Sequence, residues 1–199
     1  MTISWAESNP CELIRLANLT TIGKKPKDGW TPTKEWARKQ VLAEHSSLEF
    51  ASLIIQGDIR GDVVNQLVRA TAYHPRHEVQ SSRPDWTNKP RPSPETLRGY
   101  MGKWDVKALL QMSKERLCNH AMKETREEVE RLKLYLLKAD DIFMNAVGWS
   151  MIPQCIYRGA CPFLRNPCGW FESDWADGWS SLDERYDLYN DWFLKKYKI

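Results

Sequence analysis

Two arginines, a histidine and a glutamate gather in the stretch from Arg116 to Arg126. Arg116, His120 and Glu124 are spaced four residues apart, so they share one face of a helix with 3.6 residues per turn, and Arg126 lies close to that face. Guanidinium groups donate paired hydrogen bonds to anions. The spacing therefore predicts a helix face that holds an anion or a polar ring. The alternative is a solvated surface whose i,i+4 contacts contribute about 0.2–0.5 kcal/mol each.

The helix that must position these residues is predicted over 106–137, a run without proline or glycine. Its apolar positions form a stripe next to the charged face and are expected to pack against a core: Leu109, Leu110, Leu117, Ala121 and Val129. A second helical stretch is predicted over 134–146.

A second group of polar residues lies in the segment 70–83, which is predicted to be an irregular loop. It holds arginines, histidines, Glu78, Ser81, Ser82 and Arg83 within a few residues, and such donors suit the phosphate of a nucleotide monophosphate. The preceding helix, capped by Asp62, places Gln66 and Arg69 side by side on its second face. A basic surface loop without a ligand is the alternative.

Other elements are expected from local signals. Strands are predicted at 2–5 and 51–56, the second ending at Gly57. Asn9-Pro10 and Thr31-Pro32 each place a capping residue before a first-turn proline, and Glu35 lies in the first turn of the second of these helices.

Composition limits the class of protein. At 199 residues and 42% apolar content, the chain fits one globular domain with a small appendage. A net charge of +3 gives no strong footprint for nucleic acid, and no apolar run is long enough to cross a bilayer. We expect a soluble, cytoplasmic protein without membrane contact or specific nucleic-acid binding.

The C-terminal part is rich in cysteine and aromatic residues. We divide the chain into a catalytic domain at 1–150 and an extension at 151–199 that packs on the same domain or on a neighbouring subunit. Without a secretory signal, disulfides are not expected. Cys155, Cys161 and Cys168 could bind zinc together with a fourth ligand, but their spacing is wider than that of the usual paired cysteines, and no metal site is assigned.

Three separated blocks together resemble the flavin-dependent thymidylate synthases (the ThyX family). The first is the corner 44–49, in which Ser46 and Glu49 match the family pattern. The second begins with Gln66 and Arg69 and continues to Glu78, Ser81 or Ser82, and Arg83. The third is a helix motif matched by Arg116, His120, Ala121, Glu124 and Arg126, with Met122 in place of a glutamine. The segment with Pro153, Cys155, Gly159, Cys161 and Pro162 is also similar to the ending of some members.

The resemblance implies an α/β (α+β) fold with a small antiparallel or mixed sheet, long helices and a homotetrameric assembly. It implies a methyltransferase that makes dTMP from dUMP with FAD, NADPH and methylene-tetrahydrofolate. Arg126 would contact the pyrimidine and polarise its carbonyls. The substrate would be held by Gln66, Arg69, Glu78, Ser81, Ser82, Arg83 and Arg126. The flavin would be surrounded by Ser46, Glu49, Arg116 and His120.

The chain departs from the family pattern at one important place. Ala70 and Thr71 stand where the family has His and Arg, so two flavin contacts are missing. Two alternatives therefore stay open: flavin-independent C5 hydroxymethylation of dUMP or dCMP in the same pocket, and a nucleotide-binding protein without catalytic activity.

Overall fold

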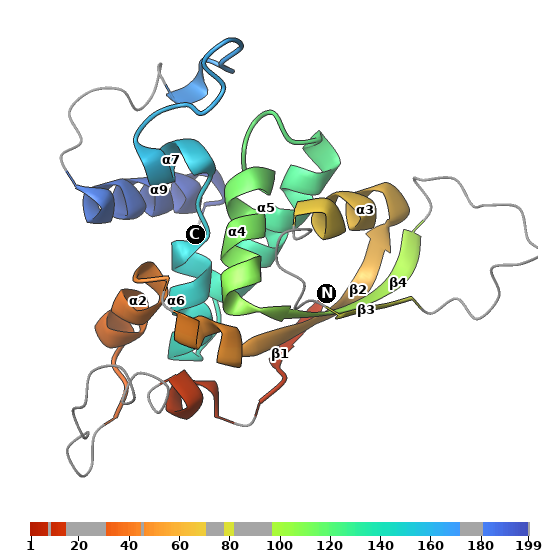
Figure 1. The fold of residues 1–199 in the computed structure, drawn as a ribbon, viewed down its shortest axis with the longest axis vertical. Helices are drawn as coiled ribbons and strands as arrows, with labels where there is room; N and C mark the ends of the chain where they lie inside the picture. The colour runs from red at the N-terminus through yellow and green to blue at the C-terminus, as the bar shows by residue number, and fades with distance from the viewer. Residues whose placement is uncertain are drawn as a thin grey trace, which may run out of the picture.

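The structure is a computed structural model, and it describes residues 1–7, 9–14, 31–44, 46–70, 78–81, 97–171 and 181–198. Four antiparallel strands form one sheet, and α3, α4 and α5 lie on one side of it (Figure 1). The predicted α+β class is confirmed. Residues 71–77 and 82–83 of the predicted phosphate loop lie outside the described part.

The sheet has the order β1-β2-β4-β3, and its central pair is the longest. β1 (Thr2–Trp5) pairs with β2 (Ser52–Arg60), which pairs along its whole length with β4 (Leu97–Asp105). The prediction that this strand ends at Gly57 is wrong. A Cβ added at Gly57 would lie 3.2 Å from the Cα of Met1, so glycine lets the strand continue past the N-terminus.

The edge strand β3 (Glu78–Ser81) pairs with β4, so the prediction of an irregular loop is wrong for these four residues. β4 itself was not predicted. Tyr100 and Trp104 are buried on one face of it, and the Trp104 Nε1–H donates to the Tyr100 hydroxyl at 2.7 Å above Gly102. A Cβ at Gly102 would lie 2.6 Å from Trp104 Nε1, so only glycine leaves room for this pair.

The helices before the site begin with polar caps. Asn9 accepts from the Glu12 N–H at 3.1 Å, which confirms the predicted cap of the helical turn at 10–14. The cap of α2 (Lys34–Leu42) is Thr33, which accepts from the Trp36 N–H, and not Thr31 as predicted. The 3₁₀ helix η1 (Ser46–Phe50) follows, and α3 (Gly61–Ala70) begins directly after β2.

The predicted continuous helix over 106–137 is wrong. α4 (Val106–Arg116) ends, a turn runs through Cys118, and α5 (Lys123–Leu137) begins after Met122. Leu117 and Val129 are both buried in the same cluster, so the chain must reverse to bring both helices onto one core. Ala121 lies in this turn and is only half-buried. Arg116, His120 and Glu124 therefore do not share one helix face.

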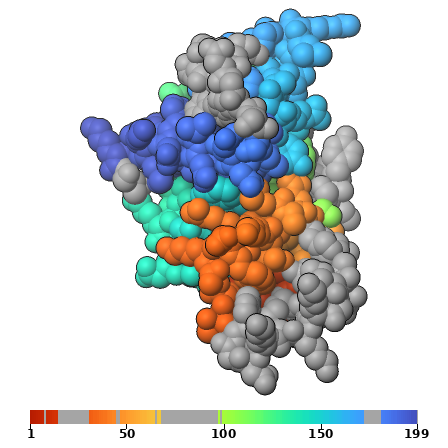
Figure 2. Space-filling view, turned by 90° about the vertical axis from the view of Figure 1, so that its left-hand side faces the viewer, coloured from red at the N-terminus to blue at the C-terminus, as the bar shows by residue number. Residues whose placement is uncertain are grey.

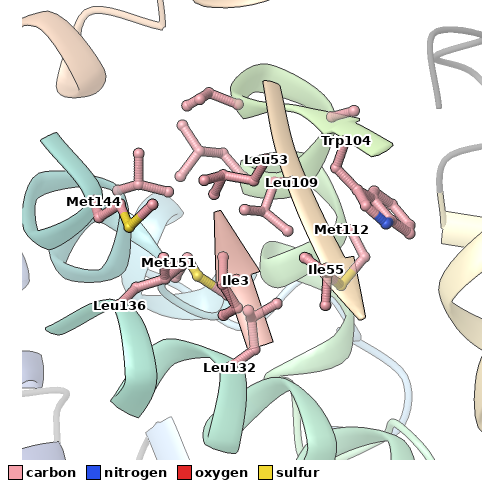
Figure 3. Packing of buried hydrophobic residues seen from close by; sticks show 14 of the residues in the cluster. Ile3, Leu53, Ile55, Trp104, Leu109, Met112, Leu132, Leu136, Met144 and Met151 are labelled. Carbon is pink, nitrogen blue, oxygen red and sulfur yellow. The ribbon is translucent and has the colours of Figure 1, made fainter. Parts of the chain in front are cut away.

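The main core lies between the sheet and the helices. Ile3, Leu53 and Ile55 of the sheet face Leu109, Leu132 and Met151 (Figure 3). α6 (Ile142–Ser150) belongs to this core and is capped by Asp141, so a break separates it from α5 and the predicted helix over 134–146 is also wrong.

A second hydrophobic cluster joins the C-terminal elements. α7 (Gln154–Arg158) and α9 (Leu182–Lys196) contribute Cys155, Ile156, Tyr186, Tyr189 and Phe193 to it. α9 packs on α6 and α7 of the same chain. The loop that follows α7, light blue in Figure 2, projects beyond α9.

Candidate functional site

A cavity of about 380 Å³ lies between the end of α4, the turn before α5, α7 and the loop after α7. This volume is at the low end of the range of about 300–1,000 Å³ that is typical of ligand pockets. Three cationic side chains, one carboxylate, two amides and an aromatic pair line it. The lining residues are Gln111, Lys114, Glu115, Arg116, Cys118, His120, Ala121, Gln154, Arg158, Pro162 and Phe163.

Arg116 is held rigidly at the edge of this cavity. Its Nε–H donates to the main-chain carbonyl of Gln66 on α3 at 3.0 Å, and a second guanidinium nitrogen lies 3.8 Å from the Glu115 carboxylate. The side chain is only 17% exposed. Arg116 thus links the cavity to the helix that carries the predicted nucleotide-binding residues Gln66 and Arg69.

Lys114 forms the positively charged wall beside Arg116. Its side chain is 5% exposed, its ammonium forms an ion pair with Glu44, and it lies 3.7 Å from the ring centre of Tyr157. Glu44 has a backbone φ of 43°, a conformation that costs energy outside glycine, and its ion pair with Lys114 helps to hold it. The negative charge of Glu44, followed by burial, raises the pKa of Tyr157.

His120 and Phe163 provide a flat surface at the mouth. Their ring centres are 4.6 Å apart, and both side chains are exposed. Arg158, on α7, lines the same cavity and is exposed as well. An exposed aromatic pair beside two guanidinium groups can stack on a ring and bind an anionic group attached to it.

The other predicted flavin residues lie elsewhere. Glu49 accepts from Lys107 Nζ at 3.1 Å, near the N-terminal end of α4. Arg116 lies nine residues further along, which corresponds to about 13 Å of helix. Glu49 does not line the cavity. Ser46 is the first residue of η1, and the structure describes only its backbone.

The predicted substrate residues are only partly described. Arg126 lies in the first turn of α5 and donates to the Asn119 carbonyl at 3.3 Å, beside the cavity but not in its wall. For Arg69, Glu78 and Ser81 the structure gives the backbone alone, on α3 and β3. Ser82 and Arg83 lie outside the described residues.

Glu124 faces a different, acidic cavity of about 260 Å³. Its carboxylate lies 3.9 Å from Arg60, which also forms a bidentate pair with Asp62. The helix breaks before α5, and Glu124 and His120 line different cavities. Glu124 therefore belongs to the packing between β2, α3 and α5 and not to the Arg116 cavity.

Sequence reasoning missed the residues that complete the cavity. Lys114, Arg158 and Phe163 come from segments up to 49 positions apart in the chain, so no local spacing relates them. One local signal existed for Lys114, since it follows Met112 and Ser113 in the buried part of α4, where a charged residue needs a partner. Arg158 and Phe163 gave no such signal.

Comparison of the chain with protein-family models finds no match, and comparison with curated proteins finds none either. Within the described part of the chain, no helix combines the length and the apolar character needed to cross a membrane. What the protein does is therefore inferred from its sequence motifs and from the geometry of the cavity.

Proposed function

We propose that this protein transfers a one-carbon unit from methylene-tetrahydrofolate to C5 of dUMP, in the manner of a flavin-dependent thymidylate synthase. One observation carries the proposal. Arg116 and His120, which the sequence motif assigns to the flavin, line one cavity, and Arg116 is hydrogen-bonded to Gln66 of the predicted nucleotide-binding helix. Two motifs 50 residues apart in the sequence thus meet at a single contact.

The cavity suits part of a flavin. About 380 Å³ accommodates one ring system with its nearest polar groups, whereas a whole dinucleotide needs additional surface. The amides of Gln111 and Gln154 offer the donors and acceptors that a flavin ring requires, and the His120–Phe163 pair offers a stacking surface. Bound reduced flavin would supply the hydride for the methyl group.

The residues of the chain would bind and orient. Arg116 and Arg158 bring positive charge that favours phosphate or a negatively charged ring. The charge of Lys114 is neutralised by Glu44. Lys114 therefore supports the wall of the cavity but attracts an anionic ligand less strongly than the two arginines. Arg126 remains the predicted pyrimidine contact, where a guanidinium would withdraw charge through a carbonyl and favour attack by C5. The homotetramer and the NADPH reductant stay predictions from the resemblance.

The replacement of two family residues by Ala70 and Thr71 favours a second candidate. A site with fewer flavin contacts could still bind the nucleotide and add a hydroxymethyl group to C5 of dUMP or dCMP without hydride transfer. The cavity next to Arg116 accommodates a mononucleotide as well as a flavin ring. The two candidates differ in their products.

The test combines colour, binding and product mass. We expect purified full-length protein to be yellow, to bind dUMP in calorimetry, and to convert dUMP to dTMP with methylene-tetrahydrofolate and NADPH. Replacing Arg116 by Ala should weaken flavin retention at least tenfold, because a hydrogen bond to a charged group contributes roughly 1.5–3 kcal/mol.

Lys123→Ala provides the matched control. It removes one positive charge from the first turn of α5, but Lys123 is exposed and does not line the cavity. A colourless protein that hydroxymethylates the nucleotide would support the second candidate. A colourless protein that binds neither dUMP nor dCMP would refute both.

A further inference from the structure

The acidic cavity that Glu124 faces is separate from the Arg116 cavity. Its volume is about 260 Å³, and its wall comes from the end of β2, the start of α3, the start of β4 and one face of α5. These elements pack together, with α3 in contact with β2, β4 and α5 (Figure 1). The two cavities share no lining residue. A ligand in the acidic cavity is therefore independent of the proposed reaction.

The wall of the acidic cavity carries more negative than positive charge. Four carboxylates and two guanidinium groups line it: Asp58, Glu124, Glu127, Glu128, Arg60 and Arg131. Both guanidinium groups already have carboxylate partners, since Arg60 donates two hydrogen bonds to Asp62 and Arg131 pairs with Glu128. The wall therefore favours a ligand that brings further positive charge.

Glu128 is the buried carboxylate of this wall, and one of its oxygens lacks a donor. Its side chain is only 9% exposed. Oε2 accepts from Arg131, whereas Oε1 is buried without a hydrogen-bond donor among the described residues. Burial raises the pKa of Glu128, and the positive charges of Arg131 and the N-terminus oppose this shift. A buried acceptor without a donor costs free energy, so a cationic donor that reaches Oε1 gains affinity from it.

The surroundings of Glu128 limit what can supply this donor. Glu128 also lines a void of about 10 Å³ on the core side, which is at the lower limit for one water molecule. An organic ligand fits only the 260 Å³ cavity. There the buried Ile59 and Val63 and the exposed Leu97 add an apolar surface to the charged wall. A small ligand that has both a cationic donor and an aliphatic chain matches this combination.

We propose that the acidic cavity binds an aliphatic diamine, with one ammonium group on Glu128 and the other near the more exposed Glu124. Two ammonium groups balance the two negative charges that the lining side chains carry in excess. The carbon chain between them covers the apolar surface. No three cysteine, histidine or acidic side chains of the described residues are arranged to hold a metal ion, and this favours an organic cation over a divalent metal.

The experiment is a calorimetric titration of the full chain with cadaverine at low ionic strength, without flavin or nucleotide. The comparison ligands are n-pentylamine, which has one ammonium group, and Mg²⁺. Glu128→Gln and Glu124→Gln each remove one negative charge and keep the shape of the side chain. Asp187→Asn is the control, because Asp187 is exposed on α9 and does not line the cavity. Circular dichroism verifies that each variant is folded.

We expect about one cadaverine per chain, bound at least threefold more tightly than n-pentylamine because only the diamine reaches both carboxylates. Glu128→Gln should weaken binding at least tenfold, since a buried charged acceptor is lost. Glu124→Gln should weaken it about threefold, because this carboxylate is partly exposed. Asp187→Asn should bind as the unmodified protein does.

A folded protein that does not bind cadaverine overturns the proposal. So does a Glu124→Gln variant with unchanged affinity, which keeps the test decisive even if Glu128→Gln does not fold. Equal weakening by Asp187→Asn would show attraction to the overall charge in place of a site, and displacement of cadaverine by equimolar Mg²⁺ would show a metal site. Because flavin and dUMP are absent from the titration, failure of the proposed function would leave its outcome unchanged.

Discussion

Lys133 is fully buried where α5, α6 and α9 meet, and its replacement tests how the C-terminal half is held together. Its ammonium donates to the Gly148 carbonyl at 2.7 Å, to the Met151 carbonyl at 2.9 Å and to Asn190 Oδ1 at 2.6 Å. Burial lowers the pKa of Lys133 well below its ordinary value. Hydrogen bonds from the ammonium to these three oxygens act in the opposite direction, because they favour the charged form. Lys133→Met removes the donor and keeps a side chain of similar length.

The expected loss follows from the acceptors. The Gly148 carbonyl keeps a bond from the Met151 N–H, so the oxygens of Met151 and Asn190 bear most of the change. A buried polar group that loses its partner costs about 1–3 kcal/mol. The substitution also removes the cost of burying a charged ammonium, and this offsets part of the loss. We therefore expect unfolding free energy to fall by about 2–4 kcal/mol, which corresponds to about 4–16 °C in Tm for a chain of this size.

Urea unfolding followed by circular dichroism measures this loss. Lys138→Met is the control, because Lys138 is exposed at the end of the same helix, and we expect it to change stability by less than about 0.5 kcal/mol. If Lys133→Met is as stable as Lys138→Met, the three hydrogen bonds do not outweigh the burial of the ammonium, and the reasoning is refuted.

Two further changes test the sheet and the start of α4. Burial raises the pKa of Tyr100 to about 12, so between about pH 10 and 12 the folded chain holds a proton that the unfolded chain has lost. The difference in unfolding free energy between the protein and Tyr100→Phe should be constant below about pH 10. As the pH rises to 12, the protein should lose up to about 2.7 kcal/mol relative to the variant. Urea unfolding measures this difference, and the same pH dependence in both proteins would contradict the prediction. Asp105 caps α4 by accepting from the Ala108 N–H at 2.7 Å, so Asp105→Ala should cost about 1–2 kcal/mol, while Asp105→Asn should cost less. Thermal unfolding distinguishes these two variants, and equal losses would mean that the negative charge matters more than the hydrogen bond.

The sequence predicted buried residues best where apolar side chains recur at the spacing of a helix. Leu109, Leu110, Leu117 and Val129 are buried as predicted, although they belong to two helices and not one. Apolar residues recur at helical spacing on both sides of the break, because α4 and α5 face the same core. The break itself depends on a tertiary requirement, the reversal of the chain, and no residue between Leu117 and Met122 is a proline or glycine that would have indicated it.

Strand β4 was missed for a related reason. Its buried face consists of Tyr100, Gly102 and Trp104, and a glycine between two aromatic residues gives no hydrophobic alternation. In the candidate site, Arg116 and His120 were found by their helical spacing, yet they meet because a turn brings His120 back over the end of α4. Arg158 and Phe163 line the same cavity because α7 packs beside the end of α4. This packing joins distant parts of the chain, so a local sequence pattern does not reveal it.

The hydrogen bonds of Lys133 also determine when the cavity can form during synthesis. Its acceptors lie 15, 18 and 57 positions later in the chain, so the ammonium has its full set of partners only after Asn190 has been made. α7, which supplies one wall of the cavity, is held in turn by Arg185 of α9 through the carbonyls of Ile156 and Tyr157. The sheet and α3 to α5 can pack while the chain is growing. We therefore expect the cavity to be completed last, so that an incomplete chain on the ribosome carries the predicted nucleotide motifs without a finished cavity.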